Sequence, residues 1–373
     1  MNPMNKTVPY ENLNLLNKRF EQEMKTKFND FLEKGWYILG DEVKQFEAAF
    51  SNYCNSPYCV GVANGLDALE MGLQVFDFPP KSEIIVPSNT YIATILAIIN
   101  AGHIPILVEP NIETYNIDET KIEEKITSKT KAIMVVHLYG QVANMDAIMD
   151  IANKNNLEVI EDCAQSHGAK FNNKMSGTFG KIGAYSFYPT KNLGAMGDAG
   201  AIITYDKEVY EKLMALRNYG SFKKYYNKYI GRNSRLDELQ ACFLNVKLPF
   251  LDEINTHKRK LARLYDLHLT NEIVKPKLLD SGHVYHIYNI RTDKRDELKQ
   301  FLLDNGIHTE IHYPVPPNQQ EGYQEHFSGL SFPISDEIHK TTLSLPISYA
   351  NTLNDIEFVI EKINLFFSNS KKN

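Results

Sequence analysis

The chain has 373 residues, of which 43% are hydrophobic and 23% are charged, and its formal net charge is −6. These proportions are ordinary for a globular protein, and the length is enough for one large domain with a smaller partner. A net negative charge gives no electrostatic attraction to nucleic acid or to an anionic membrane, so neither is expected as a partner. A negatively charged substrate would instead need a local basic pocket.

The N-terminus and the apolar runs argue against export and against membrane insertion. The first twenty residues lack the apolar core of a signal peptide. The longest apolar runs, such as residues 95–99, are far below the roughly 18 residues that a membrane span requires. The cysteines show no C-x-x-C spacing, so we expect buried or idle thiols in a reducing cytosol. The sequence therefore predicts a cytoplasmic protein, and its cysteines are Cys54, Cys59, Cys163 and Cys242.

The N-terminal part predicts helices followed by a first strand. Apolar side chains recur at helical spacing over residues 10–34, which indicates an amphipathic helix. After Gly35, Trp36 and Tyr37 either pack in the core or contact a ligand, with neither alternative favoured. A further helix is expected to end near Tyr53, and a short strand to cover residues 58–62.

A candidate phosphate site follows this strand. Gly65 opens a predicted helix, so the backbone N–H groups of Gly65 and Leu66 would be exposed beside the positive end of the helix dipole. A plain helix N-terminus is an equally good interpretation from this stretch alone.

Strands and helices then alternate, which indicates a mostly parallel sheet covered by helices. The first expected strand of this part begins at residue 83, and the others cover residues 104–109, 131–136, 157–160 and 182–188. The expected intervening helices cover residues 118–126 and 145–153.

The stretch from residue 161 to residue 201 contains the strongest chemical signal. Asp162 ends a predicted buried strand, and ligands of open α/β sheets gather at the carboxyl ends of strands. The next strand carries Ser186, and Lys191 follows among small residues. A carboxylate and a lysine on neighbouring strand ends are what a pyridoxal phosphate (PLP) site requires. The lysine forms the Schiff base and the carboxylate keeps the pyridine nitrogen protonated.

Simpler interpretations compete with this one. A lysine in a glycine-rich loop is usually a solvated surface residue, and an Asp at a strand end is often a helix cap. The spacing Gly194-x-x-Gly197-x-x-Gly200 does not match G-x-G-x-x-G, and no Walker motif is present. The glycine spacing therefore disfavours a nicotinamide-dependent oxidoreductase.

Beyond residue 201 the pattern predicts a strand, a helix and then a smaller C-terminal domain. The Tyr- and Lys-rich stretch 222–229 is expected to be a solvated loop rather than a nucleotide or phosphate contact. Pro249 and an expected break at residues 252–255 place the boundary between domains 1–250 and 251–373. We expect the polar tail 368–373 to be disordered. The remaining expected elements are the strands 202–205 and 283–291 and the helices 207–217, 257–268, 293–305 and 356–366.

Several motifs resemble the DegT/DnrJ/EryC1/StrS family of PLP-dependent sugar aminotransferases. The likeness covers residues 37–317 and is carried by GWYILGDEVKQFE, EDCAQSHGA, SFYPTKNLGAMGDAGAI, GRNSRLD and HYPVP. It implies an α/β fold, like that of aspartate aminotransferase (PLP fold type I). The large domain would have a mostly parallel mixed sheet, and a smaller α+β domain would lie at the C-terminus.

The resemblance also implies roles for residues that match the family's motifs. Asp162 matches the partner of the pyridine nitrogen, Gln165 the residue bonded to the phenolic oxygen, and Tyr91 the aromatic that stacks on the ring. Ser186 matches a phosphate ligand and Lys191 the Schiff-base lysine. Asn233 matches a residue that reaches the phosphate in the neighbouring subunit, which implies a homodimer with shared sites. The implied substrate contacts are Tyr37, Leu39, Tyr188, His312 and Tyr313.

Three positions qualify this transfer. The family commonly has a hydroxyl residue where this chain has Leu66, so the amides of Gly65 and Leu66 would hold the phosphate. The family usually has His where this chain has Asn318, so substrate contacts there stay open. His137, in the motif HLYGQ, is interpreted as a residue that stabilises the fold or supports the ligand-contacting residues, and not as a catalytic residue.

Lys191 favours the aminotransferase branch, because dehydratase members carry His at that position. The implied reaction takes the amino group of L-glutamate, through pyridoxamine phosphate (PMP), to the ketone of a nucleotide-linked deoxysugar. The wording of residues 63–67 and 87–94 favours C3 of a dTDP-3-keto-6-deoxyhexose over a C4-acting enzyme on a UDP- or dTDP-4-keto sugar. A non-catalytic PLP-fold binding protein is the alternative of another class, and the intact set of site residues disfavours it.

Overall fold

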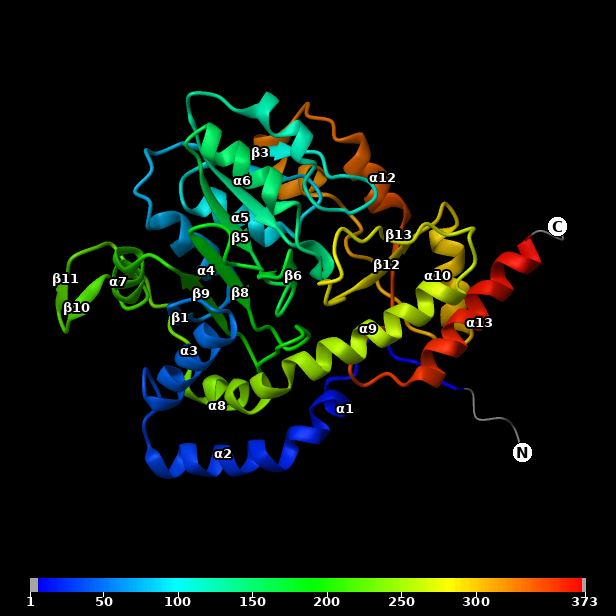
Figure 1. Ribbon diagram of the computed structural model, residues 1–373, viewed down its shortest axis with the longest axis horizontal. Helices are drawn as coiled ribbons and strands as arrows, with labels where there is room; N and C mark the ends of the chain where they lie inside the picture. Colours follow the sequence, from blue (N-terminus) through cyan, green and yellow to red (C-terminus); the bar gives the residue numbers. More distant parts are fainter. Residues whose placement is uncertain (1–5, 371–373) are drawn as a thin grey trace.

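The computed structural model describes residues 6–370 and is built around one sheet (Figure 1). The sheet has the strand order β1-β9-β8-β5-β4-β2-β3. The pairs β2–β3, β2–β4, β4–β5 and β5–β8 are parallel, whereas β9 pairs antiparallel with β8 and β1. This confirms the prediction of a mostly parallel mixed sheet. Its strands are β1 Tyr58–Val62, β2 Glu83–Pro87, β3 Ile104–Val108, β4 Thr130–Val136, β5 Glu158–Asp162, β8 Ile182–Ser186 and β9 Gly200–Thr204.

Helices cover both faces of this sheet, because successive side chains of a buried strand point to opposite faces and both sets here are apolar. Ile84 and Val86 pack in the cluster that contains α4, α5 and α7, whereas Ile85 packs in the cluster that contains α6. At the other end of the sheet, Ile203 packs with α3 and α8. These helices are α3 Asp41–Tyr53, α4 Gly65–Gln74, α5 Ile92–Asn100, α6 Met145–Lys154, α7 Lys207–Leu216 and α8 Glu238–Lys247.

The N-terminal helix is not the single element predicted over residues 10–34. It is divided into α1 Leu13–Asn17, a 3-10 turn Lys18–Phe20 and α2 Glu21–Lys34. Asn12 caps α1 through a 3.0 Å bond from the Leu15 amide, and the 3-10 turn buries Phe20 against Phe250.

The expected helix 118–126 is wrong: the segment forms two 3-10 turns, Glu119–Lys121 and Glu123–Lys125. Asp118 caps the first turn, and only Ile122 is buried, so no apolar stripe supports a longer helix.

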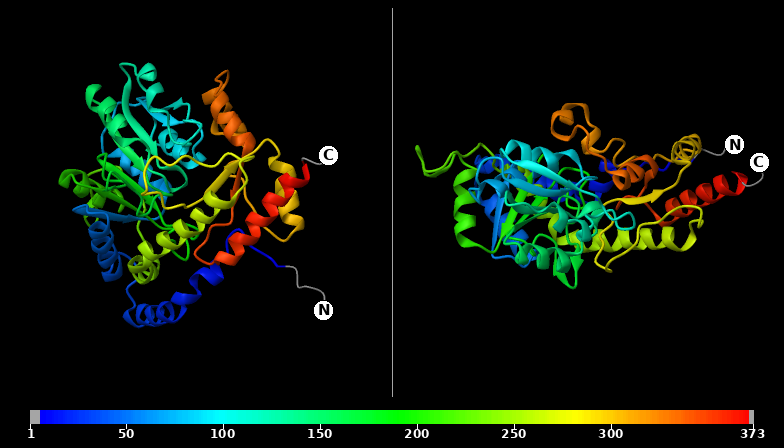
Figure 2. Two further views of the ribbon diagram at one scale, coloured as in Figure 1. Left: turned by 45° about the vertical axis from the view of Figure 1, so that its right-hand side comes forward. Right: turned by 90° about the horizontal axis from the view of Figure 1, so that it is seen from above.

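The C-terminal part forms a second layer of structure beside the sheet, in which α9 and α13 lie side by side (Figure 2). The expected break at residues 252–255 is wrong, because α9 runs through it. Pro249 is accommodated in a 3-10 turn, and Asp252 and Glu253 favour a helix N-terminus. The elements are α9 Leu251–His268, β12 Tyr288–Arg291, α10 Arg295–Asp304, α11 Gln324–Phe327, α12 Pro333–Thr341, β13 Thr342–Leu345 and α13 Leu353–Ser370.

The strand expected over residues 283–291 is shorter. Tyr285 has a φ of +46°, and the amides of Val284 and Ile287 bond to Gly140 and Tyr139, so only β12 pairs with β13. α11, α12 and β13 were not predicted. The expected tail overlaps the end of α13 at residues 368–370, and residues 371–373 lie outside the described chain.

Packing crosses the predicted domain boundary in both directions. Val8 packs in the C-terminal cluster, whereas Phe327 and Phe332 pack against the main sheet. The division at residue 250 stays a prediction. The four cysteines are buried free thiols, as expected. Within residues 6–370, no helix combines the length and apolarity that a membrane crossing would need.

Candidate active site

Asp162 lies at the carboxyl end of β5 and is buried. Its Oδ2 accepts a 2.8 Å hydrogen bond from Oγ1 of Thr94, and its Oδ1 accepts a 3.1 Å bond from the amide of Ala164. Burial raises the pKa of this carboxyl, and the two hydrogen bonds and the charge of Lys191 oppose the rise. A turn rather than a helix follows β5, so Asp162 is not a helix cap. A buried carboxylate is therefore held at the edge where the sheet presents its strand ends.

Lys191 lies in the loop between β8 and β9 and is partly buried, which argues against a solvated surface lysine. Burial lowers the pKa of its amine to about 8, although the carboxylate of Asp162 acts in the opposite direction. Nζ of Lys191 lies 3.5 Å from Nε2 of His286. An amine with this pKa is partly neutral near pH 8 and can act as a nucleophile or a base.

Gln165 joins two segments of the site. Its Oε1 accepts a 2.6 Å bond from the amide of Tyr139, and its Nε2 donates a 2.9 Å bond to the hydroxyl of Tyr313. The ring of Tyr313 lies 5.3 Å from the ring of Tyr91, which is 53% exposed at the start of α5. The structure thus brings Tyr91, Gln165 and Tyr313 together, as the sequence motifs implied.

The candidate phosphate site is the N-terminus of α4. Asn64 caps this helix by accepting a 2.8 Å bond from the amide of Asp67. The amides of Gly65 and Leu66 have no acceptor among the described residues. A Cβ on Gly65 would lie 2.6 Å from Cβ of Ser186, so only glycine fits beside this serine. Two free N–H groups at a helix N-terminus, next to a serine, form a suitable phosphate site.

These features fit PLP. A phosphate would bind the amides at α4 and Ser186, a pyridine nitrogen would need the buried carboxylate, and an aldehyde would need the amine. The amides start α4, Ser186 and the carboxylate end β8 and β5, and the amine lies in the loop that follows β8. The residues present are therefore suited to the cofactor that the sequence predicts.

Two further predicted residues lie near this group. Nδ1 of His312 is 2.9 Å from Oγ of Ser344, and burial, together with the charge of Lys191, lowers the pKa of the His312 imidazole to about 4. Tyr188 is 52% exposed, and its amide donates to Oγ of Ser186 over 3.3 Å. His312 is therefore neutral at pH 7, and the hydroxyl of Tyr188 has no hydrogen-bond partner among residues 6–370.

Tyr37, Leu39 and Asn233 do not join this group within one chain. Tyr37 is exposed and packs against Phe31 with ring centroids 5.0 Å apart, and Leu39 packs on the cluster that contains α3. Asn233 is exposed, and its side chain forms no hydrogen bond among the described residues. Trp36 is 66% exposed, so its alternative interpretation as a core residue is wrong.

His137 is fully buried and structural. Its Nδ1 accepts a 3.2 Å bond from the amide of Ala143, so its Nε2 carries the proton and donates to Glu161 over 2.8 Å. Glu161 also accepts three backbone bonds of 2.7 Å, from residues 177, 179 and 180. Both side chains are thus used within the fold, as expected for His137.

Thr94 and His286 were missed by the sequence analysis. Thr94 lies three residues after Tyr91 in the first turn of α5, and this spacing could have indicated that both face the same site. His286 lies in a segment interpreted as a strand, and no local signal marked it.

The stretch 222–229 forms a small exposed hairpin from β10 Ser221–Lys223 and β11 Tyr226–Asn227. Its lysines lie over its own aromatic rings; Nζ of Lys223, for example, is 4.9 Å from the ring centroid of Tyr226. Within one chain the stretch is exposed, as predicted for a solvated loop, but it forms a hairpin of two short strands.

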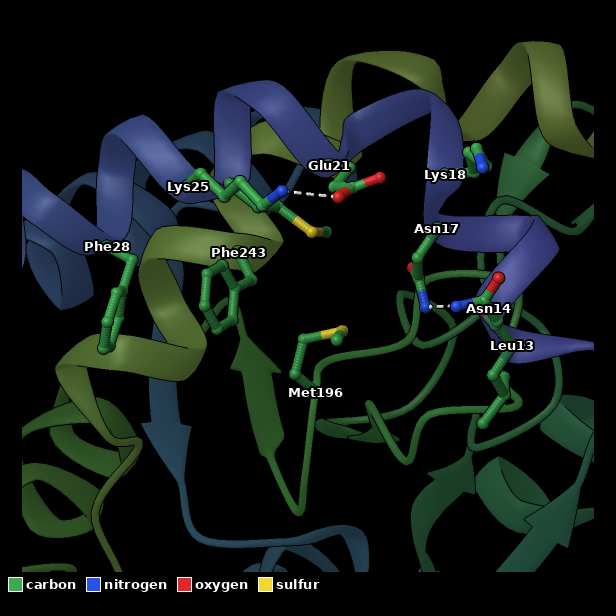
Figure 3. A pocket seen from close by; sticks show the side chains of 10 residues that line it. Leu13, Asn14, Asn17, Lys18, Glu21, Lys25, Phe28, Met196 and Phe243 are labelled. Carbon is green, nitrogen blue, oxygen red and sulfur yellow. Dashed lines mark hydrogen bonds and ion pairs between the residues drawn. The ribbon is translucent and has the colours of Figure 1, made fainter.

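A separate groove of about 610 Å³ lies under α1 and α2 (Figure 3). Met196, which follows Lys191 by five residues, and Phe243 of α8 point into it, and Lys25 and Glu21 lie at its margin. None of the predicted cofactor residues lines this groove.

Comparison with known proteins agrees with the geometry of the site. The DegT/DnrJ/EryC1/StrS aminotransferase family matches residues 18–364. The dTDP-3-amino-3,6-dideoxy-alpha-D-galactopyranose transaminase of Aneurinibacillus thermoaerophilus is 51% identical over 361 residues, which are 96% of this chain and 99% of that protein.

Solved structures show the same fold. DesV of S. venezuelae, in complex with a ketimine intermediate, has a TM-score of 0.94 at 38% identity, and the match covers 96% of this chain and 98% of that one. NtdA of Bacillus subtilis, with bound cofactor PMP, has a TM-score of 0.91 at 31% identity, covering 97% of this chain and 85% of that one. The predicted fold class, enzyme class and cofactor are confirmed. The chain belongs to the DegT/DnrJ/EryC1/StrS aminotransferase family and is a PLP-dependent aminotransferase.

Proposed function

We propose that this aminotransferase moves the amino group of L-glutamate to C3 of a dTDP-3-keto-6-deoxyhexose. The single observation that carries the amino-transfer chemistry is the lysine amine with a pKa of about 8, close enough to the buried carboxylate of Asp162 to feel its charge. The relative that is 51% identical is named as a dTDP-3-amino-sugar transaminase, which supports a nucleotide sugar with nitrogen at C3.

The chain's own residues have separate tasks in this reaction. The amides of Gly65 and Leu66, with Ser186, hold the phosphate, and Tyr91 covers one face of the ring. When bound, PLP supplies the electron sink that stabilises negative charge at the reacting carbon. Asp162 keeps the pyridine nitrogen protonated, because a buried carboxylate stabilises a neighbouring positive charge.

Lys191 binds the cofactor and then moves protons. Its Nζ would hold the cofactor by a bond to the aldehyde carbon, whose oxygen leaves as water, and the amine of the donor would take its place. The freed amine then takes a proton from Cα of the donor and delivers it to the cofactor carbon. A pKa of about 8 suits both directions, since the amine must be neutral to accept a proton and charged to return it.

Gln165 and Tyr313 connect the cofactor site to the proposed sugar site. Gln165 is proposed to bond the phenolic oxygen of the cofactor, and its Nε2 donates to the hydroxyl of Tyr313. His312, Tyr188, Tyr37 and Leu39 are proposed to contact the sugar or its nucleotide.

The active unit is proposed to be a homodimer. Asn233 is exposed and its side chain is unpartnered among residues 6–370, which supports a role toward the phosphate of a neighbouring chain. In a two-fold dimer such a contact is reciprocal, so each chain would lend one asparagine and receive one.

Purified protein, glutamate and a panel of 3-keto and 4-keto dTDP- and UDP-sugars test this function. The expected product is a dTDP-sugar with nitrogen on C3, identified by NMR. An amine found only on C4, or only on a UDP-sugar, contradicts the proposed substrate and leaves the aminotransferase class unchanged. A non-catalytic protein would show no change in the visible absorbance of bound PLP when glutamate is added.

A further inference from the structure

Lys258 of α9 is a buried lysine outside the predicted site. It is 4% exposed, and its Nζ forms no ion pair with any residue of the described chain. Burying a charged amine without a carboxylate is unfavourable, and burial lowers the pKa of this amine to about 8.

The hydrogen bonds of this amine reach Asn192, which follows Lys191 in the chain, and His286, which contacts Lys191 in space. Nζ of Lys258 donates to Oδ1 of Asn192 over 3.1 Å and to the carbonyl oxygen of His286 over 3.2 Å. Asn192 directly follows Lys191 in the chain, and the ring of His286 lies 3.5 Å from Nζ of Lys191. One amine therefore holds the side chain of the residue that follows Lys191 and the backbone of the residue whose ring contacts Lys191.

The contact with Asn192 completes a fully bonded side chain. Nδ2 of Asn192 donates to Oδ1 of Asn255 over 2.8 Å and to the carbonyl oxygen of Val284 over 3.0 Å, and Asn192 is 6% exposed. Asn255, on α9 one turn before Lys258, donates in turn to the carbonyl oxygen of His167. A buried network in which every member is bonded fixes geometry. The residue after Lys191 is thus attached to α9 and to the segment of Val284, and α9 is bonded in turn to His167.

A second buried lysine holds the same loop further on. Nζ of Lys247, which is 1% exposed, donates to the carbonyl oxygen of Gly194 over 2.6 Å and to Oδ1 of Asn17 over 3.1 Å. The loop that begins at Lys191 is therefore held by α9 at its start and by α8 three residues later.

We propose that Lys258 is a positioning residue that holds Nζ of Lys191 where it bonds to the cofactor, acting through Asn192 and His286. This role rests on the proposed function of Lys191. It predicts a specific defect: loss of Lys258 slows the reaction of Lys191 with PLP, while the contacts that hold the phosphate and ring of the cofactor stay intact. A residue that only stabilised α9 would affect both to the same degree.

The test compares Lys258→Met with Lys260→Met, which makes the same change at an exposed position of the same helix. Two quantities are measured on cofactor-free protein. The first is the affinity for PMP, which has no aldehyde and binds without a bond to lysine, by calorimetry. The second is the rate at which PLP bonds to Lys191, followed by borohydride trapping and mass spectrometry of the peptide.

For Lys258→Met we expect PMP affinity within about twofold of the parent and a bonding rate lower by about tenfold to a hundredfold, the scale of a displaced reacting group. Lys260→Met should change neither quantity. An unchanged bonding rate in Lys258→Met contradicts the proposal, and so does an equal loss of PMP affinity.

If Lys258→Met does not fold, Asn192→Ala replaces it, because it removes the acceptor of the same bond. The same split between bonding rate and PMP affinity is expected, and a parental bonding rate overturns the proposal. Trapping of PLP on a residue other than Lys191 in the parent protein would refute the proposed role of Lys191 itself. That result is distinguishable from a failure of Lys258 alone.

Discussion

Oγ1 of Thr94 donates a 2.8 Å hydrogen bond to Oδ2 of Asp162, which joins the first turn of α5 to the end of β5. The same helix begins beside Tyr91. One short segment therefore places the aromatic ring proposed to cover the cofactor and also orients the carboxylate proposed to face its nitrogen.

Asp162→Asn should lower the turnover rate by about a hundredfold or more, the scale of a lost electrostatic contact in a transition state. The substitution keeps the shape and removes the charge that favours a protonated pyridine nitrogen. Thr94→Val is the milder companion: it keeps the charge and removes only the hydrogen bond. Steady-state kinetics of both variants check this order, and an Asp162→Asn enzyme as active as its parent would contradict the assignment.

Gly65→Ala should weaken binding of the cofactor by about tenfold, because its Cβ would lie 2.6 Å from Cβ of Ser186 and displace one side of the phosphate site. Gly322→Ala is the matched control, since no atom lies within 4 Å of a Cβ at that position. Equilibrium dialysis against PMP measures both. Equal affinities in the two variants would show that the N-terminus of α4 does not hold the phosphate.

Acid should destabilise the fold through His167, which is fully buried and has its pKa lowered by burial to about 3. In the unfolded chain the imidazole has a pKa near 6.5 and binds a proton below that pH, whereas the folded protein keeps it neutral until about pH 3. The free energy of unfolding is therefore highest above pH 6.5 and falls as the pH is lowered toward 3. Between pH 7 and pH 5 this one group removes about 2 kcal/mol.

Urea unfolding of the parent and of His167→Leu at pH 7 and pH 5, at one protein concentration, measures this contribution. The variant should lose about 2 kcal/mol less between the two pH values than its parent does. The same loss in both proteins would show that His167 does not carry the effect.

Mixed dimers test whether Asn233 serves the neighbouring chain. Lys191→Ala and Asn233→Asp homodimers should each be nearly inactive, the second because a carboxylate faces the cofactor phosphate. In a mixed dimer with shared sites, one site collects both defects and the other has none. Random re-pairing of equal amounts should therefore restore roughly a quarter of the parental activity.

If Asn233 instead served its own chain, every site in every combination would carry one defect. Re-paired mixtures no more active than their parents would then refute the shared site. Mass spectrometry of the intact dimers confirms that re-pairing took place.

The sheet was predictable, and the residues proposed to hold the cofactor could be selected, because both kinds of signal are local. A short apolar run such as residues 157–160, set between helical patterns and polar residues, is typical of a buried strand. Gly65 starts α4 and Asp162 ends β5, whereas Lys191 lies in the loop that follows β8 and was marked by its motif. Such positions are defined by a few neighbouring residues.

The contacts between distant segments were not predictable in this way. The bond between Gln165 and Tyr313 spans 148 positions, and nothing in either stretch names the other residue. Tyr285 could not be recognised as the residue whose positive φ ends the expected strand, because a tyrosine rarely adopts that conformation. His286 and Lys258 could not be recognised for the same reason. Each contacts Lys191 or Asn192 from a segment distant in the sequence.

Transfer of labelled nitrogen in two separated steps tests whether the enzyme carries the amino group from glutamate to C3 of the sugar. The purified protein is first incubated with [15N]glutamate and then freed of the donor by gel filtration. A dTDP-3-keto-6-deoxyhexose is added afterwards, and the sugar is analysed by NMR. We expect about one labelled nitrogen per active site on C3 of the sugar, and none when Lys191→Ala replaces the parent protein. A sugar that stays unlabelled with the parent protein, or is labelled equally with Lys191→Ala, would contradict this expectation.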